Sequence, residues 1–457
     1  MKKTMSVIAT VLVGTLGAVG TVHGQSLEEA LAIAYSNNPT LLAEQAGLRG
    51  TDEGVSQALA NWRPTVEMSS SAGVSAIRNN TGTGTTKGQH RDPKSLSLSI
   101  SQPLYRGGRT VAATREALNT VKAERARLDS VEQTVLLEAA TAFMNVVRDQ
   151  AVLELNTNNE QVLKRQLEAT SDRFRVGEIT RTDVHQAEAR LALATADRIQ
   201  SEGDLEASRA AFQNVVGQAP EKLSPVEPLT GLPGSEEEAI KTAVAGDPGI
   251  IALDFDEKAL RHNVTEVRGE LLPEVTLSAE ASRNLESSSE TSRVTTVKGT
   301  VSLSVPLYQT GAVYSRLRAA RQAVAEKRLG IDQARRDAIE EATRTWEALQ
   351  TARARIKSLK TSIKAAEVAL EGVVRESEVG SRTVLDVLDA EQELLDAKVT
   401  LVRAQRDQMV AIFELKTAMG QFTARHLSLP VALYDPETHF REVRMKWVGG
   451  RSSGDVK

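Results

Sequence analysis

Residues 98–105 read Leu-Ser-Ile-Ser-Gln-Pro-Leu-Tyr, and residues 301–308 read Val-Ser-Leu-Ser-Val-Pro-Leu-Tyr. The two stretches lie 203 positions apart, and Val176-Gly177 and Val379-Gly380 are separated by the same distance. Upstream the spacing is 209, as between Pro64 and Pro273. One unit of about 200 residues is therefore present twice, and a duplication that keeps its register usually builds a pseudo-symmetric assembly.

Each copy is predicted to contain, in order, helix, strand, strand, long helix, turn and helix. Alternation of apolar and hydroxylated side chains predicts strands at about 64–77 and 95–105, and again at about 273–283 and 294–308. The segment 78–94 is rich in Asn, Gly, Thr and Lys and is expected to be a loop, as is 284–293. The six-residue length difference between the copies falls in this loop, where insertions are tolerated.

The longest predicted elements are two helical rods. Residues 109–176 contain neither glycine nor proline, which predicts one helix of about 100 Å, and 312–379 is its counterpart. Helices at 181–217 and 383–420 follow the rods, and apolar residues from Leu385 onward recur largely at heptad spacing, as in a coiled coil. We assign 25–234 to the first structural repeat, 235–430 to the second, and 431–457 to a C-terminal segment with a flexible tail.

The first 24 residues have the pattern of a secretory signal. Lys2 and Lys3 precede a short apolar core at 7–19 and a small-residue cleavage site at 22–24. The alternative, an N-terminal anchor helix, is disfavoured because the apolar stretch is too short to span a bilayer. The chain has no cysteine, hence no disulfide and no acylated cysteine, and its net charge of −4 argues against a nucleic-acid partner.

No catalytic or metal-binding pattern is recognisable. The six histidines are scattered, and no zinc-binding motif, nucleophile elbow or catalytic triad is present. Gly107-Gly108 follows a strand but lacks the further residues of a phosphate-binding loop. We therefore expect a protein that is not an enzyme, with no cofactor and no metal.

The number of strands decides whether one chain could form a closed barrel. No apolar helix follows the signal, so entry into a membrane requires a β-barrel, and four amphipathic strands are too few to close one. Three chains supply twelve strands, with the serine faces toward water and the Val, Leu and Ile faces toward lipid. Pro103, Tyr105, Pro306 and Tyr308 mark the strand–helix junctions, where the tyrosines suit a membrane interface. The alternative is a soluble β-hairpin that caps a helical bundle.

Several motifs resemble those of one known family. They are Ser26-Leu27 with Asn38-Pro39, Gln102-Pro103-Leu104-Tyr105 with Gly107-Gly108, Arg173-Phe174 with Val176-Gly177 and Thr182-Asp183-Val184, and Val379-Gly380 with Arg382-Thr383 and Asp386-Val387-Leu388. The chain resembles the TolC family of outer-membrane efflux and type I secretion channels over nearly its whole length after the signal. The resemblance implies a homotrimer whose 12-stranded outer-membrane barrel continues as an α-helical coiled-coil tunnel across the periplasm. It also implies an equatorial belt, formed by about 218–247 and the C-terminal region.

The resemblance further implies a passive exit duct of a tripartite export system. A periplasmic adaptor and an inner-membrane ABC or proton-driven transporter would dock at the tips, Val176, Gly177, Val379 and Gly380, and open the entrance. Whether the cargo is a drug, a metal or a polypeptide stays open, although Tyr434-Asp435-Pro436-Glu437 resembles the tail of secretion-type members. The alternative function is a periplasmic coiled-coil adaptor with a β-hairpin head.

Asp386 and Asp389 are three residues apart and therefore share one helical face. In a trimer they would form a ring of carboxylates that attracts cations, whereas the alternative is an ordinary solvated helix face. The resemblance makes them the constriction of the pore and makes Arg382, Thr182 and Asp183 the contacts that hold the gate shut. Ser377 occupies the place of a tyrosine in the best-known family members.

Overall fold

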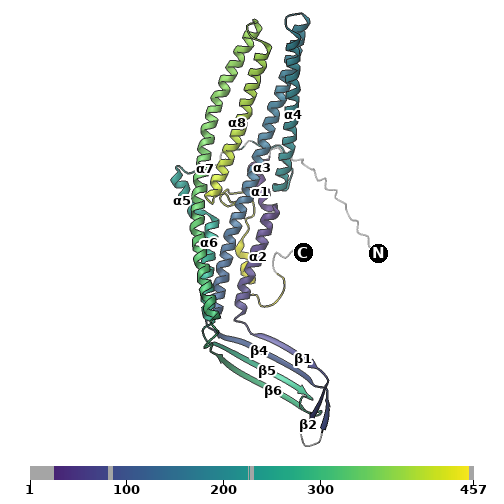
Figure 1. Ribbon diagram of the computed structural model, residues 1–457, viewed down its shortest axis with the longest axis vertical. Helices are drawn as coiled ribbons and strands as arrows, with labels where there is room; N and C mark the ends of the chain where they lie inside the picture. Colours follow the sequence, from purple (N-terminus) through teal and green to yellow (C-terminus); the bar gives the residue numbers. More distant parts are fainter. Residues whose placement is uncertain (1–24, 81–85, 225, 227–230, 452–457) are drawn as a thin grey trace, which may run out of the picture.

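The molecule consists of a long helical body with a sheet attached at an angle to one end (Figure 1). The computed structural model describes residues 25–80, 86–224, 226 and 231–451. The predicted signal segment 1–24 and the end of the predicted tail, 452–457, lie outside the described residues.

The helices of the two repeats correspond one to one. The first repeat contributes α1 (Leu27–Asn37), α2 (Pro39–Ala60), α3 (Arg109–Arg175) and α4 (Arg181–Val216). The second contributes α5 (Glu236–Gly246), α6 (Pro248–Gly269), α7 (Ala312–Glu378) and α8 (Val384–Ala418), and a short α9 (Pro436–Val443) follows. The rods α3 and α7 have 67 residues each, which corresponds to about 100 Å. Two antiparallel helix pairs, α3 with α4 and α7 with α8, lie side by side at the end away from the sheet (Figure 1).

The main sheet is antiparallel with the strand order β1 (Thr65–Ala72), β4 (Lys94–Arg106), β5 (Glu274–Leu285) and β6 (Arg293–Ser304). Two predictions for the first repeat were wrong here. The strand expected at 64–77 is interrupted, and the expected loop 78–94 contains a separate hairpin of β2 (Ser75–Asn80) and β3 (Thr86–Arg91). The interruption lies where Gly73 donates its backbone N–H to Pro93 at 3.0 Å, and Pro93 has no N–H with which to continue the ladder.

The strand predicted at 294–308 ends earlier than expected. β6 stops at Ser304, opposite Glu274, because β5 begins there, directly after Pro273. Among the described residues, Val305 to Tyr308 therefore have no neighbouring strand. Leu307 is 93% exposed and Tyr308 83% exposed. The second strand–helix junction thus lies at an open edge of the sheet.

The register of the sheet separates an apolar face from a hydroxylated face. Met68, Leu98, Ala281 and Val297 are aligned across the four strands, and the next row on the other face is Ser69, Ser97, Ser282 and Thr296. On that second face Ser69 and Ser97 share a hydrogen bond of 2.7 Å between their hydroxyls. A register shift between Pro103 and Tyr105 places Tyr105 opposite Val275, on the apolar face. This agrees with the predicted alternation of polarity.

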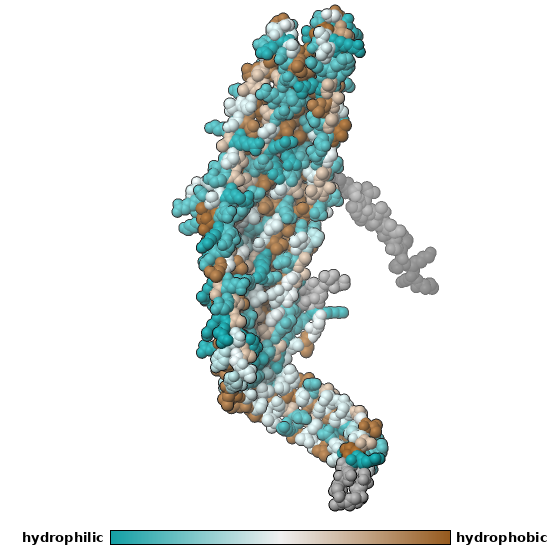
Figure 2. Space-filling view, viewed as in Figure 1, coloured by the Kyte–Doolittle hydropathy of each residue, from teal (hydrophilic) through white to brown (hydrophobic). Residues whose placement is uncertain are grey.

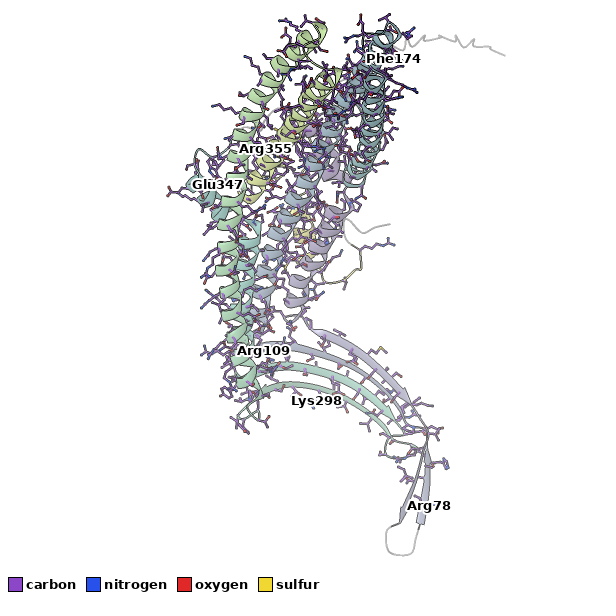
Figure 3. All side chains as sticks on the ribbon, turned by 45° about the horizontal axis from the view of Figure 1, so that its top comes forward. Arg78, Arg109, Phe174, Lys298, Glu347 and Arg355 are labelled. Carbon is purple, nitrogen blue, oxygen red and sulfur yellow. The ribbon has the colours of Figure 1, made fainter. Side chains whose placement is uncertain are left out.

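A network of polar and backbone contacts joins the sheet to the helices. Arg109 donates to Glu274 at 2.7 Å and lies at the bend in Figure 3. Gly107 has a φ of +61°, and a Cβ on it would lie 2.3 Å from the carbonyl oxygen of Gly269, so this approach requires glycine. Figure 2 shows apolar side chains gathered at this junction. Leu104 in β4 and Leu272, which precedes β5, are both exposed.

The main hydrophobic core lies in the middle of the helical body. Phe143 and Phe212 are fully buried with ring centroids 6.3 Å apart, and Phe413 and Phe422 are buried with centroids 5.6 Å apart. Both repeats contribute to this one core, which extends to the C-terminal segment through Phe440. At the end of α8, Gly420 approaches the backbone of Gly246 so closely that a Cβ on it would lie 2.1 Å from the Gly246 oxygen.

No helix among residues 25–80, 86–224, 226 and 231–451 combines the length and the apolar character needed to cross a bilayer.

The stretch that follows α8 is fixed to α3 by an acidic side chain with an unusual pKa. Glu132 accepts a hydrogen bond of 2.6 Å from the backbone N–H of Ala424. Burial raises the pKa of Glu132 to about 7; Asp129 adds to the increase, while the Ala424 hydrogen bond and Arg425 oppose it. An acid whose folded-state pKa is raised stabilises the fold fully only below its unfolded pKa, and this contribution is lost as the pH rises through the folded pKa.

Glu132→Gln should therefore raise the thermal unfolding temperature at pH 8.5, where the buried carboxylate costs about 3 kcal/mol, and not at pH 4.5. Glutamine keeps an acceptor for the Ala424 N–H, so the hydrogen bond survives. Scanning calorimetry of the detergent-solubilised protein at both pH values measures the difference. Glu154→Gln, an exposed position on the same helix, is the control and should change neither value. Equal unfolding temperatures for Glu132→Gln and wild type at pH 8.5 would contradict the prediction.

Candidate functional site: the helix–turn–helix tips

Each helix pair ends in a tight turn centred on a left-handed glycine. Gly177 has a φ of +83° and Gly380 a φ of +78°, values that favour glycine. After α3, Glu178 N–H donates to Arg173 O at 3.0 Å, and after α7, Ser381 N–H donates to Glu376 O at 2.9 Å. Val176 and Val379 precede the glycines and are 73% and 80% exposed. Phe174 lies at the same tip as Val176 (Figure 3) and is also exposed. Both tips thus present apolar side chains to their surroundings.

The helices that follow the turns begin with the same capping box. Thr180 N–H donates to Asp183 Oδ2 at 2.9 Å, and Thr383 N–H donates to Asp386 Oδ2 at 2.9 Å. In the second box the Thr383 backbone N–H, and then its hydroxyl, hold the pKa of Asp386 below its usual range. Asp386 is therefore ionised at neutral pH, and Asp183 occupies the equivalent position in the first repeat.

Asp389, one helical turn beyond Asp386, contacts the other repeat. Its Oδ1 lies 2.5 Å from Nη2 of Arg190 on α4, which makes this ion pair a direct link between α4 and α8 near the tips. The Arg190 side chain is 32% exposed and the Asp389 side chain 56% exposed, so water screens the pair. Just beyond the turns, Leu163, Ala187, Ala194, Val384 and Leu388 form a small buried cluster that also joins the repeats.

Within the single chain, the predicted gate residue Arg382 contacts only its own repeat. Arg382 Nε donates to Glu376 at 3.0 Å, and Arg382 Nη1 lies 3.9 Å from Asp386, so both contacts stay within its own turn. Among the described residues of the single chain, no hydrogen bond or ion pair joins Arg382 to Thr182 or Asp183. Thr182 is exposed, whereas Ser377 is buried in the last turn of α7.

Two residues of this region were not singled out in the sequence. Arg190 neutralises Asp389, and Glu391 is a partly buried acid whose pKa is raised by burial and whose Oε2 has no hydrogen-bond partner. Comparison of the repeats offered a signal for Arg190, because its equivalent 203 positions later is Glu393, while the equivalent of Asp389 is Gln186. Charges that differ between otherwise matching positions indicate that the two repeats have diverged there.

The tips carry both charged and apolar side chains. Asp386 is ionised, Asp389 forms an ion pair with Arg190, and exposed apolar side chains lie at the turns. Within the part of the chain that the structure describes, no three His, Asp or Glu side chains converge as metal ligands would. The tips therefore combine ionised carboxylates with exposed apolar side chains.

A model of the outer membrane efflux protein family matches residues 30–218 and 239–421, one match for each repeat. The chain belongs to the outer membrane efflux protein family. Outer membrane efflux protein BepC of Brucella suis is 32% identical over 451 residues, which cover 98% of this chain and 97% of that protein. Alkaline protease secretion protein AprF of Pseudomonas aeruginosa is 24% identical and covers 76% of this chain and 75% of that protein.

Solved structures give the same fold. The outer membrane protein VceC of Vibrio cholerae superposes with a TM-score of 0.73 at 22% identity, covering 86% of this chain and 96% of that chain. The outer-membrane channel OprN superposes with a TM-score of 0.74 at 22% identity, covering 86% and 89%. The predicted family and fold class, mainly helical with a strand section continued by long paired helices, are thereby confirmed.

The predicted function and location are also confirmed by these comparisons. This member of the efflux family is an outer-membrane export protein that extends into the periplasm, and its family consists of channels. The alternative of a periplasmic adaptor has no support from these matches. Pro103 and Tyr105 lie within β4, whereas Pro306 and Tyr308 lie beyond β6, so the four predicted junction residues occupy two different environments.

Proposed function

We propose that the protein is the exit duct of a tripartite export system and works as a homotrimer. Three chains would close a 12-stranded barrel in the outer membrane, and their helix pairs would form a tunnel through the periplasm. A periplasmic adaptor and an inner-membrane ABC or proton-driven transporter would engage the tips at Val176, Gly177, Val379 and Gly380. The channel itself would be passive and would need no cofactor.

The unfinished edges of the main sheet support this proposal most directly. β1 and β6 are the two outer strands, and each pairs with one neighbour in the chain. Exposed edges of this length invite pairing with another chain. The apolar face is also uncovered, since Met68 is 69% and Val297 82% exposed. A second and a third copy would satisfy the edges, and lipid would cover the apolar face.

The duplication predicts the register of the proposed contact between chains. Within the chain Ser99 of β4 lies opposite Glu280 of β5. Adding 203 to Ser99 gives Ser302 in β6, and subtracting 209 from Glu280 gives Ser71 in β1. We therefore expect Ser302 of one chain to lie opposite Ser71 of the next, both on the hydroxylated face.

Ser71→Cys combined with Ser302→Cys should consequently form disulfides between chains. Because the natural chain has no cysteine, every disulfide is diagnostic, and a covalent trimer should appear on non-reducing gels after mild oxidation of the membranes. The control is Ser70→Cys with Ser302→Cys, whose side chains lie on opposite faces of the sheet after a shift of one residue. Monomer alone in the first variant, or equal cross-linking in both, would contradict the proposed assembly.

The gate is part of the same proposal. Arg382, Thr182, Asp183 and Ser377 would contact neighbouring helices in the closed trimer, and Asp386 and Asp389 would line the narrowest part of the tunnel. The ionised state of Asp386 and its position beside the turn support this role. The relatives include proteins named for efflux and for protease secretion, and the cargo stays open between a drug, a metal and a polypeptide. Tyr434-Asp435-Pro436-Glu437, which leads into α9, resembles the tail of secretion-type members and therefore favours a polypeptide.

A further inference from the structure

The segment that follows α9 is fixed next to the start of the sheet. Arg63 Nη1 donates to the backbone oxygen of Lys446 at 2.8 Å, and Ser56 Oγ donates to the same oxygen at 3.3 Å. The Arg63 guanidinium also lies 4.9 Å from the ring centroid of Trp447. Only Pro64 separates Arg63 from Thr65, the first residue of β1, so Trp447 is held at the level where the sheet begins. Figure 1 shows this yellow segment beside the half of α2 that is nearer to the sheet.

The same segment exposes large apolar side chains. Met445 is 68%, Trp447 63% and Val448 86% exposed, although the backbone around them is anchored. A cluster of this kind on an anchored segment indicates a contact surface rather than an ordinary loop. Trp62, which precedes Arg63 and is 45% exposed, extends the apolar surface toward β1.

The charge of the segment selects one kind of partner. Residues 441–451 contain Arg441, Arg444, Lys446 and Arg451 but only one acid, Glu442, in a chain whose net charge is −4. Basic residues interleaved with Trp and aliphatic side chains are typical of segments that lie on an anionic membrane surface. Tryptophan is enriched at the level of lipid headgroups, which is where the end of the sheet would place it.

We propose that residues 444–451 are a membrane-surface anchor, which inserts Met445, Trp447 and Val448 among the phospholipid headgroups of the leaflet that faces the periplasm. Arg444, Lys446 and Arg451 would contact the phosphates of anionic lipids. The anchor rests on the proposed function, because the sheet must lie in the membrane. It adds a contact from the end of the chain, outside the strands, that ties the helical body to the bilayer.

Quenching of tryptophan fluorescence by brominated phospholipid tests the anchor. The full-length trimer with Trp447 as its sole tryptophan (Trp62→Phe with Trp346→Phe) is placed in nanodiscs that contain anionic phospholipid. Bromine on the upper part of the acyl chains should reduce the emission of Trp447 about twofold, because interfacial tryptophans lie within contact distance of it. A protein with Trp346 alone, in the helical body, is the matched control and should keep its emission.

A third protein separates failure of the anchor from failure of the assembly. It lacks the three native tryptophans and carries Val297→Trp on the apolar face of β6. Quenching of Val297→Trp without quenching of Trp447 would overturn the anchor and leave the assembly intact; a blue-shifted Trp447 emission would then indicate that a neighbouring chain covers it. If neither is quenched, the sheet is not in the membrane and both proposals fail.

The basic residues make a second, independent prediction. Replacing Arg444, Lys446 and Arg451 with glutamine should remove the difference in Trp447 quenching between anionic and zwitterionic nanodiscs. Arg353→Gln with Arg355→Gln is the control, because these exposed residues lie on α7 far from the sheet (Figure 3). Quenching that is equal in both lipids already in the unmodified segment would overturn the anionic preference.

Discussion

Gly420→Ala should prevent the protein from reaching its folded, trimeric state. The new Cβ would lie 2.1 Å from the backbone oxygen of Gly246, and the φ of +72° at this position is itself unfavourable for alanine. A backbone atom cannot rotate away as a side chain can, so the end of α8 and the end of α5 must separate. We expect a loss of more than about 3 kcal/mol, the range of severe core disruptions.

The measurement is the yield of heat-modifiable trimer in membrane fractions, together with the unfolding temperature of any protein obtained. Gly330→Ala is the matched control, since no atom lies within 4 Å of a Cβ there and the residue is inside α7. This substitution should stabilise the helix by about 0.5–1 kcal/mol. A Gly420→Ala protein with wild-type yield and unfolding temperature would show that the two helix ends are not packed as described.

Asp386→Asn combined with Asp389→Asn should strongly weaken block of the channel by divalent cations added on the periplasmic side. In the proposed trimer the two substitutions remove every carboxylate of the ring while asparagine keeps an oxygen for the Thr383 cap. A divalent cation about 6 Å from one carboxylate gains about 1.4 kcal/mol in water, or a factor of ten in affinity. Loss of the whole ring should therefore weaken block by well over tenfold, even after screening by salt.

Single-channel recording in planar bilayers gives the affinity directly. Glu367→Gln with Glu371→Gln removes the same charge from exposed positions of α7 near the same tip and should leave block unchanged. Arg190→Gln should act in the opposite direction and tighten block, because it releases Asp389 from its ion pair. Unchanged block in the Asp386 and Asp389 double variant would mean that these residues are an ordinary solvated helix face.

The sequence predicted those features that depend on local periodicity. Alternation identified β4 and β5, and the absence of glycine and proline in 109–175 identified α3. The hairpin of β2 and β3 was missed because Gly, Asn, Thr and Lys dominate its sequence, and pairing rather than propensity makes it a hairpin. Arg190 was missed for a related reason, since its partner Asp389 is 199 residues away and only the placement of α4 beside α8 brings them together.

The roles expected at the entrance could be predicted only in part. The equivalence of Asp183 and Asp386 was visible in the repeat, but their function as caps of α4 and α8 emerges from the geometry of the turns. Arg382 was expected to reach the other turn, and within one chain it pairs with Glu376. The other contacts of these residues would form between chains, and the sequence of a single chain contains no direct signal for such contacts.

The Arg190–Asp389 pair has a consequence for how an entrance of this kind would dilate. At the equivalent place between chains, Glu393 of one α8 would face Gln186 of the next α4, and this combination cannot form an ion pair. A ring built from six similar helix pairs would therefore alternate between three seams joined by an ion pair and three seams without one. We expect dilation to begin at the seams without an ion pair, so that the two helix pairs of each chain move together as one unit.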